Sequence, residues 1–147
     1  MQTPTQTPTA DADSDSDSDT DAHCTDIDLV WTAEVHDASG HAGTSFTAAD
    51  ELSVVGVATN PCANAIDFTT STGCMVAHGT FTAVHGATGT VFAPDCTMVI
   101  TTWTVAAGHS ISEANSIGSG WAADDYTATV FFNWGGETAH TTVTVTH

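Results

Sequence analysis

The stretch of residues 126–145, YTATVFFNWGGETAHTTVTV, decides the fold class. Apolar and polar side chains alternate with a period of two on both sides of a short turn, which is the pattern of two antiparallel strands joined by a hairpin. The two inward series are Tyr126, Ala128, Val130, Phe132 and Ala139, Thr141, Val143, Val145, with Asn133-Trp134-Gly135-Gly136 between them.

The same alternation continues through the chain after residue 24. Thr, Val and Ile, whose β-branched side chains suit pleated strands, account for 46 of the 147 residues. Further strands are predicted at residues 27–35, 52–58, 66–68, 75–81, 91–92 and 99–105. Seven to eight short strands separated by turn signals predict an all-β protein, an antiparallel immunoglobulin-like β-sandwich. A closed barrel is the alternative architecture.

The charge of the chain excludes several classes of function. The chain has 18 Asp and Glu, eight His and neither Lys nor Arg, which gives a formal net charge of −18. Binding to nucleic acid or to anionic lipid depends on Lys and Arg, so neither partner is expected. No apolar run approaches the roughly 18 residues that indicate a membrane span. A protein is therefore the expected kind of partner, with no direct insertion into a membrane.

Residues 1–23 differ from the rest of the chain and predict a disordered tether before a domain at residues 24–147. The tether has six Asp at alternate positions, from Asp11 to Asp21, and no large apolar side chain after Met1. An EF-hand loop needs Gly at position 6 and Glu at position 12. Counting from Asp11, those positions are Ser16 and Ala22, so the pattern does not predict a specific calcium site.

Four cysteines, Cys24, Cys62, Cys74 and Cys96, predict two disulfides. The start of the first strand lies beside the end of its antiparallel neighbour, which pairs Cys24 with Cys62 and leaves Cys74 for Cys96. Four reduced thiols are the alternative. Disulfides together with an acidic tether predict an extracellular or cell-surface location.

The sequence offers no pattern typical of catalysis or metal binding. It has no G-x-S-x-G nucleophile elbow, no C-x-x-C pair and no H-x-x-x-H or H-x-H spacing. We therefore expect no enzyme activity, no cofactor and no metal site, with the histidines facing solvent. A metal site assembled across strands is the alternative.

Two aromatic residues have distinct predicted roles. Tyr126 lies at the entry to the penultimate strand and resembles a corner tyrosine, whose hydroxyl bonds to backbone upstream in the chain. Trp134 stands at the tip of the last hairpin and is the candidate for an exposed contact with a binding partner. The alternative is that Trp134 folds back over its own hairpin.

Several segments carry a family resemblance: residues 52–59 followed by Asn60, Ile66-Asp67-Phe68, the hairpin with Gly86, residues 103–110 (WTVAAGHS) and Asp125-Tyr126-Thr127. Together they resemble the immunoglobulin-like intracellular proteinase inhibitor (BsuPI-like) domain over residues 27–145. Ala107 stands where the family pattern has proline, Asp124-Asp125 replaces Pro-Gly, and the four cysteines are additional. The acidic linker and the cysteines are similar to those of surface lipoproteins.

Two functions follow as hypotheses. The first is a non-enzymatic extracellular or cell-surface module for protein binding or structural display. The alternative, which the resemblance implies, is a proteinase inhibitor acting through loops at one end of the sandwich. Residues 70–73 and 85–89 are the candidate inhibitory loops, although neither has an obvious anchor side chain.

Overall fold

The computed structural model describes residues 23–147, which are largely β-strand. A 3₁₀ turn, η2 (Asp26–Asp28), precedes the strands. The strands are β1 (Val30–His36), β2 (Ser45–Thr47), β3 (Leu52–Thr59), β4 (Ile66–Thr70), β5 (Val76–Ala83), β6 (Gly89–Phe92), β7 (Thr101–Val105), β8 (Ser110–Gly118), β9 (Asp124–Phe132) and β10 (Thr138–Thr146). Apart from His23, the segment predicted to be a tether lies outside the described residues.

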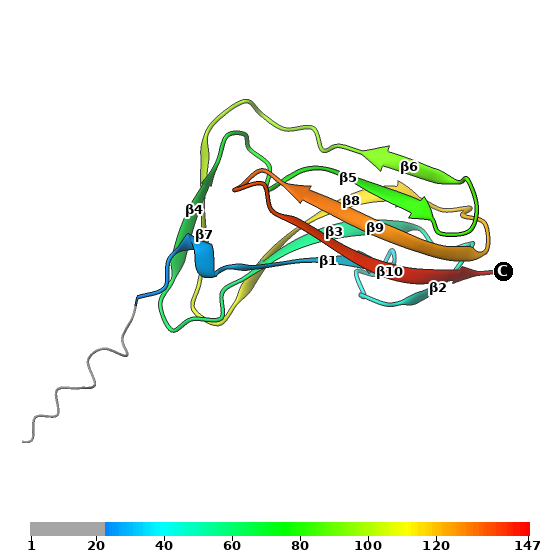
Figure 1. Ribbon diagram of the computed structural model, residues 1–147, viewed down its shortest axis with the longest axis horizontal. Coiled ribbons are helices and arrows are strands. Elements are labelled where there is room, and N and C mark those ends of the chain that lie inside the picture. Colours follow the sequence, from blue (N-terminus) through cyan, green and yellow to red (C-terminus); the bar gives the residue numbers. More distant parts are fainter. Residues whose placement is uncertain (1–22) are drawn as a thin grey trace, which may run out of the picture.

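Two sheets pack against each other as a sandwich, which confirms the predicted all-β class (Figure 1). One sheet has three strands in the order β1-β3-β8, and the other has five in the order β2-β10-β9-β5-β6. Strands β4 and β7 form a separate two-stranded ribbon across one end. Pairing is antiparallel except between β2 and β10, which are parallel.

The predicted number of seven to eight strands is too low, because the described residues contain ten. Strands β2 and β8 were not predicted. β2 has only three residues, and β8 alternates small or polar residues with only two isoleucines, so neither has a strong apolar period. Pairing with β10 and β3, respectively, holds them in place. The predicted strand at residues 99–105 also begins later, at Thr101.

The core lies between the two sheets and contains most of the side chains that the alternation placed inward. Val55 and Val76 are also fully buried although their neighbours were predicted to face inward, and Ile27, predicted to face inward, lies in η2 and is 78% exposed. The largest fully buried members of the core are Tyr126, Phe81, Leu52, Met75, Val35, Val54, Val55, Val76, Val105, Val130, Val143 and Val145. The facing sheet lies close to Gly56, where a Cβ would lie 2.8 Å from both Phe132 and Val76. A side chain at this position would force the sheets apart.

Tyr126 occupies the predicted corner role. Its hydroxyl donates a hydrogen bond to the backbone oxygen of Ala122 at 3.0 Å, and its ring stacks on Phe81 with centroids 4.6 Å apart. Trp121 meets both rings edge to face. This cluster holds residues 121–123, which lead into β9, against the core of the sandwich.

Chain direction gives the sandwich two different ends. One end carries residues 23–29, 60–75, 93–109 and 133–137, and we call it the disulfide-bearing end. The opposite end carries the turns at residues 37–44, 84–88 and 119–123, and the C-terminus lies there (Figure 1).

Candidate binding surface at the disulfide-bearing end

Both disulfides lie at one end of the sandwich. Cys24, before β1, is bonded to Cys62, which follows β3, and Cys74, before β5, is bonded to Cys96, which follows β6. This is the pairing predicted from the antiparallel arrangement, and the described residues contain no free cysteine. Two disulfides in a small β domain indicate an oxidising, extracellular setting.

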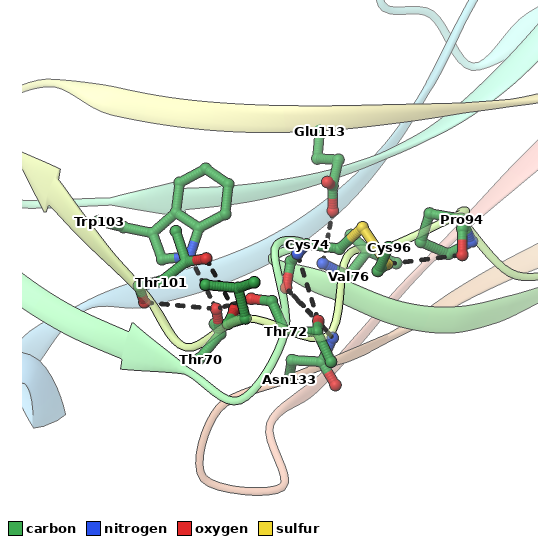
Figure 2. Close-up of a disulfide and its surroundings, with 11 residues drawn as sticks. Thr70, Thr72, Cys74, Val76, Pro94, Cys96, Thr101, Trp103, Glu113 and Asn133 are labelled. Atoms are coloured by element: carbon green, nitrogen blue, oxygen red, sulfur yellow. Dashed lines mark hydrogen bonds between the residues drawn. A yellow bond between two sulfur atoms is a disulfide. The ribbon is translucent and has the colours of Figure 1, made fainter.

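Residues 93–100, which connect β6 to β7, form a loop that is held at both sides of its tip. The Cys74–Cys96 bridge attaches it to the chain before β5 (Figure 2). The Gly73 N–H donates to the backbone oxygen of Thr97 at 2.8 Å, and the Thr101 hydroxyl donates to the backbone oxygen of Val99 at 3.0 Å. These contacts restrict the loop before any partner binds.

The tip of this β6–β7 loop is the most exposed apolar segment of the domain. Met98 is 85% exposed, Val99 61% and Ile100 73%. Single exposed apolar residues are common on protein surfaces, but a contiguous run is typical of an interaction site. The tip therefore presents three adjacent apolar anchors on a restrained base.

The sequence had indicated other loops. Val99 was predicted to lie in a strand with Thr101 and Trp103, because these residues continue a period of two. In the structure the period belongs to β7 only from Thr101 onward, and Val99 lies in the loop. The signal that could have identified the tip is the run of three apolar residues, Met98 to Ile100, which breaks the alternation shortly after Pro94 and Cys96.

The chain before β5 is fastened to the last hairpin as well as to the β6–β7 loop. The Asn133 side-chain amide donates to the Thr72 hydroxyl and to the Cys74 backbone oxygen, each at 3.1 Å (Figure 2). The Asn133 N–H donates to the backbone oxygen of Met75 at 2.8 Å. Three segments far apart in sequence thus form one connected surface.

The side chain of Glu113, on β8, forms a hydrogen bond with the start of β5, which belongs to the facing sheet. Its carboxylate accepts a hydrogen bond from the Val76 N–H at 2.6 Å (Figure 2). Burial raises the pKa of the Glu113 carboxyl above its ordinary value, although hydrogen bonds from the backbone of Val76 and Met75 act in the opposite direction. The bond connects the two sheets beside Cys74.

Trp134, the predicted contact residue, is half-buried in an aromatic cluster. Its ring stacks on Trp31 with centroids 5.5 Å apart and meets Phe68 edge to face at 6.5 Å. Trp103 stacks on the other side of Phe68, and its indole N–H donates to the buried Thr70 hydroxyl at 3.0 Å. The side chain of Trp134 therefore supports the end of the sandwich, whereas the apolar tip stands free.

The two predicted inhibitory loops lie at different ends. Residues 70–73 belong to the disulfide-bearing end, where Thr70 is buried and Ser71 is the one exposed residue of the four. Residues 85–89 lie at the opposite end, where His85 Nδ1 is 2.8 Å from Asp124 Oδ1. Neither segment presents a large apolar side chain.

Histidines and acidic residues meet only in pairs within residues 23–147. His36 Nε2 lies 2.7 Å from Glu34 Oε2, and the His85–Asp124 pair is described above. No group of three His, Cys, Asp or Glu residues in this range is placed to hold a metal ion. The same residues include no helix that is long and apolar enough to cross a bilayer.

Comparison with known proteins adds no assignment. No protein-family model matches the chain, and no curated protein matches it.

Proposed function

We propose that this chain is a non-enzymatic, immunoglobulin-like module that lies outside the cytoplasm, tethered at the cell surface. Its function is to bind a protein partner or to serve in structural display. The observation that carries the proposal is the contiguous apolar tip, Met98 to Ile100, on a loop held by a disulfide and by backbone hydrogen bonds. An apolar anchor on a restrained loop loses little conformational entropy on binding.

The strand order supports the immunoglobulin-like assignment. In variable-type immunoglobulin domains, the sheet of strands G, F and C gains an additional C′ strand, and A, B and E belong to the other sheet. The order β10-β9-β5-β6 matches G-F-C-C′, and β1-β3-β8 matches A-B-E. The disulfide-bearing end then corresponds to the end where variable domains place their binding loops.

A capture experiment tests the proposed function. The full chain is immobilised beside a variant with Met98→Asp and Ile100→Asp, and both are exposed to an extract of extracellular and cell-envelope proteins. The matched control is Ile27→Asp, which changes an equally exposed apolar residue on η2. We expect a protein retained by the wild type and the control but lost with the loop variant. If no retained protein depends on the loop, the proposal is wrong.

Proteinase inhibition is the second candidate, and the same loop favours it. Residues 97–100 lie outside any strand, are exposed and are fastened on both sides, which suits an extended substrate cleft with an apolar specificity pocket. The test is a titration of chymotrypsin-like, elastase-like and subtilisin-like proteinases with the full chain. Inhibition that disappears with Met98→Asp supports this function, and rapid cleavage of the loop without inhibition contradicts it.

A further inference from the structure

Strand β8 has one edge without a neighbouring strand among the described residues. β3 covers its other edge. The Gly43 N–H donates to the backbone oxygen of Val35 at 3.0 Å, so the backbone of Val35 faces away from β3. In an antiparallel sheet, the N–H and C=O groups of successive residues point alternately to the two sides of the strand. The register from β1 to β3, and then from β3 to β8, carries this alternation across the sheet. It follows that the N–H and C=O groups of Ser112, Ala114 and Ser116 point toward the open edge of β8.

This edge is free of exposed charge in a strongly acidic chain. The side chains of Ser112, Ala114 and Ser116 are exposed and small. The single charged residue of β8, Glu113, faces inward and bonds the Val76 N–H. By contrast, the edge strand β1 of the same sheet carries Glu34 and His36. An open, uncharged edge is a template for pairing with another strand.

The sequence of β8 is nearly symmetric about its centre. Residues 110–118 read S-I-S-E-A-N-S-I-G, so that positions equally distant from Ala114 match: Glu113 with Asn115, Ser112 with Ser116, and Ile111 with Ile117. Such a strand is complementary to a second copy of itself in the antiparallel direction. A two-fold axis at Ala114 would place each residue opposite its match.

A buried side chain without a hydrogen-bond partner also favours pairing of β8 with a second copy. The side-chain amide nitrogen of Asn115 is buried and has no hydrogen-bond partner in the structure. Buried polar atoms are nearly always bonded in native proteins. Two-fold pairing at Ala114 puts Glu113 of the second copy directly opposite Asn115, and its carboxylate retains lone pairs besides those that the β5 backbone uses.

We propose that two copies of this chain pair through β8, antiparallel and centred on Ala114, to form a continuous six-stranded sheet in the order β1-β3-β8-β8-β3-β1. The backbone of Ala114 forms hydrogen bonds with the backbone of Ala114 in the second copy, and the backbone of Ser112 does so with that of Ser116. The side chain of Glu113 meets the side chain of Asn115 of the second copy on the inner face. The contact is isologous, so it closes at a dimer. It uses a different surface from the β6–β7 loop and gives the assembly two such loops.

Electrostatics sets the conditions under which the dimer forms. Each copy carries a formal charge of −18, so the two copies repel each other at low ionic strength. Salt screens this repulsion, with a Debye length of about 10 Å at 0.1 M and about 3 Å at 1 M. The dimer therefore becomes more stable as salt rises.

Sedimentation equilibrium of the full chain at low salt and in 1 M NaCl tests the proposal. Ala114→Pro removes an N–H that faces the open edge and leaves the β3–β8 ladder intact. The matched control is Val91→Pro on β6. The Ala83 N–H donates to the Thr88 backbone oxygen, and from this bond the β5–β6 register places the Val91 N–H on the side of β6 that faces away from β5. Thermal melting checks that each variant folds.

We expect a dimer in 1 M NaCl for the wild type and for Val91→Pro, and a dissociation constant raised at least about tenfold by Ala114→Pro. A wild type that stays monomeric at both salt concentrations overturns the proposal, as does an Ala114→Pro variant that dimerises equally well.

A charge exchange gives a second test that does not alter the backbone. Ser112→Asp together with Ser116→Asp places like charges opposite each other across the two-fold axis and should abolish the dimer. Ser112→Asp together with Ser116→Lys places opposite charges there and should restore it. Both changed positions, Ser112 and Ser116, are exposed in the monomer. If both double variants dimerise to the same extent, the β8 pairing is wrong.

Discussion

The disulfide-bearing end and the opposite end of the sandwich both consist of loops, yet they are held by different chemistry. At the first, two disulfides, the buried Thr70 hydroxyl and the half-buried Glu113 carboxylate fasten the chain. At the opposite end, partly buried aspartates organise the turns. Asp37 accepts hydrogen bonds from the Ser39 and His41 N–H groups at 2.8 and 3.0 Å.

The comparison shows how a chain without Lys or Arg stabilises its loops. Aspartate side chains can replace backbone partners in turns, and they require no cation to do so. The apolar β6–β7 tip cannot be held in this way, because its exposed side chains have nothing to pack against. Covalent attachment through Cys96 restrains it instead. The disulfide-bearing end should therefore respond to reduction as well as to pH, whereas the opposite end should respond to pH only.

Removing either disulfide should have the largest effect on stability. We expect Cys74→Ser with Cys96→Ser to lower the free energy of unfolding by about 2–4 kcal/mol, because the unfolded chain gains conformational entropy. Urea denaturation of the wild type and the variant measures the change. Cys24→Ser with Cys62→Ser is the comparison, and its longer closed segment, with a sequence separation of 38 against 22, predicts an equal or larger loss.

Glu113 provides the next largest effect. Glu113→Ala leaves the buried Val76 N–H without an acceptor and should cost about 1–3 kcal/mol. Glu113→Gln keeps an oxygen acceptor and removes the charge, so its cost should be smaller. Urea denaturation at neutral pH compares the two variants, and an equal loss in both would contradict the hydrogen-bond explanation.

The pH dependence of Glu113 has a definite sign. Because burial raises the pKa of this carboxyl in the folded state, its contribution to stability is largest at low pH and decreases as pH rises through the folded pKa. The stability of Glu113→Gln relative to the wild type should therefore improve from acid to neutral pH. A constant difference between the two across this range would show that the charge does not matter.

Salt should stabilise the domain as a whole. Of the 18 acidic residues, twelve lie in residues 24–147, and no Lys or Arg offsets them. We expect the melting temperature to rise from low salt to 1 M NaCl, because salt screens the repulsion between these carboxylates. A melting temperature that stays flat with salt at both pH 7.5 and pH 5.5 would show that charge repulsion does not limit stability.

The smallest expected effect belongs to Asp124 at the opposite end. The hydrogen bond from the His85 side chain holds the pKa of this carboxyl below its ordinary value. A lowered folded pKa stabilises the fold above the unfolded pKa, and the contribution is lost as pH falls through the folded pKa. Asp124→Ala should therefore lower the melting temperature at neutral pH and match the wild type in strong acid.

A control separates this effect from the general loss of a negative charge. Asp95→Ala removes an exposed carboxylate from the β6–β7 loop and should raise the melting temperature slightly or leave it unchanged. If both variants shift the melting temperature equally, the His85–Asp124 pair contributes nothing specific.

Strong local alternation made much of the fold predictable. The strands β9 and β10 have nine residues each, their period of two runs through residues 126–132 and 139–145, and both strands were predicted. The Cys24–Cys62 pairing followed from the antiparallel neighbours β1 and β3. Strand β8 has no such local signal, because two isoleucines among serines do not distinguish a strand from a loop. Its structure depends on pairing with β3 over eight residue pairs.

The candidate surface was less predictable for a related reason. Met98, Val99 and Ile100 have the residue types of a buried strand, and sequence alone assigned Val99 to one. Whether an apolar residue is exposed depends on what the rest of the chain places over it, and no element covers this loop. Conversely, Trp134 looked exposed at a hairpin tip but is partly covered by Trp31 and Phe68, which precede it by more than 60 residues.

By itself, the sequence determined the all-β class, the alternation that builds most of the core, the corner role of Tyr126 and the net charge of the chain. These properties depend on residue type and on spacing within a few positions of the chain. Only the tertiary structure decided which apolar residues stay exposed, which strand edge stays open and how the loops of one end are fastened together. Those outcomes depend on contacts between segments far apart in sequence, and the local periodicity of the sequence does not predict such contacts.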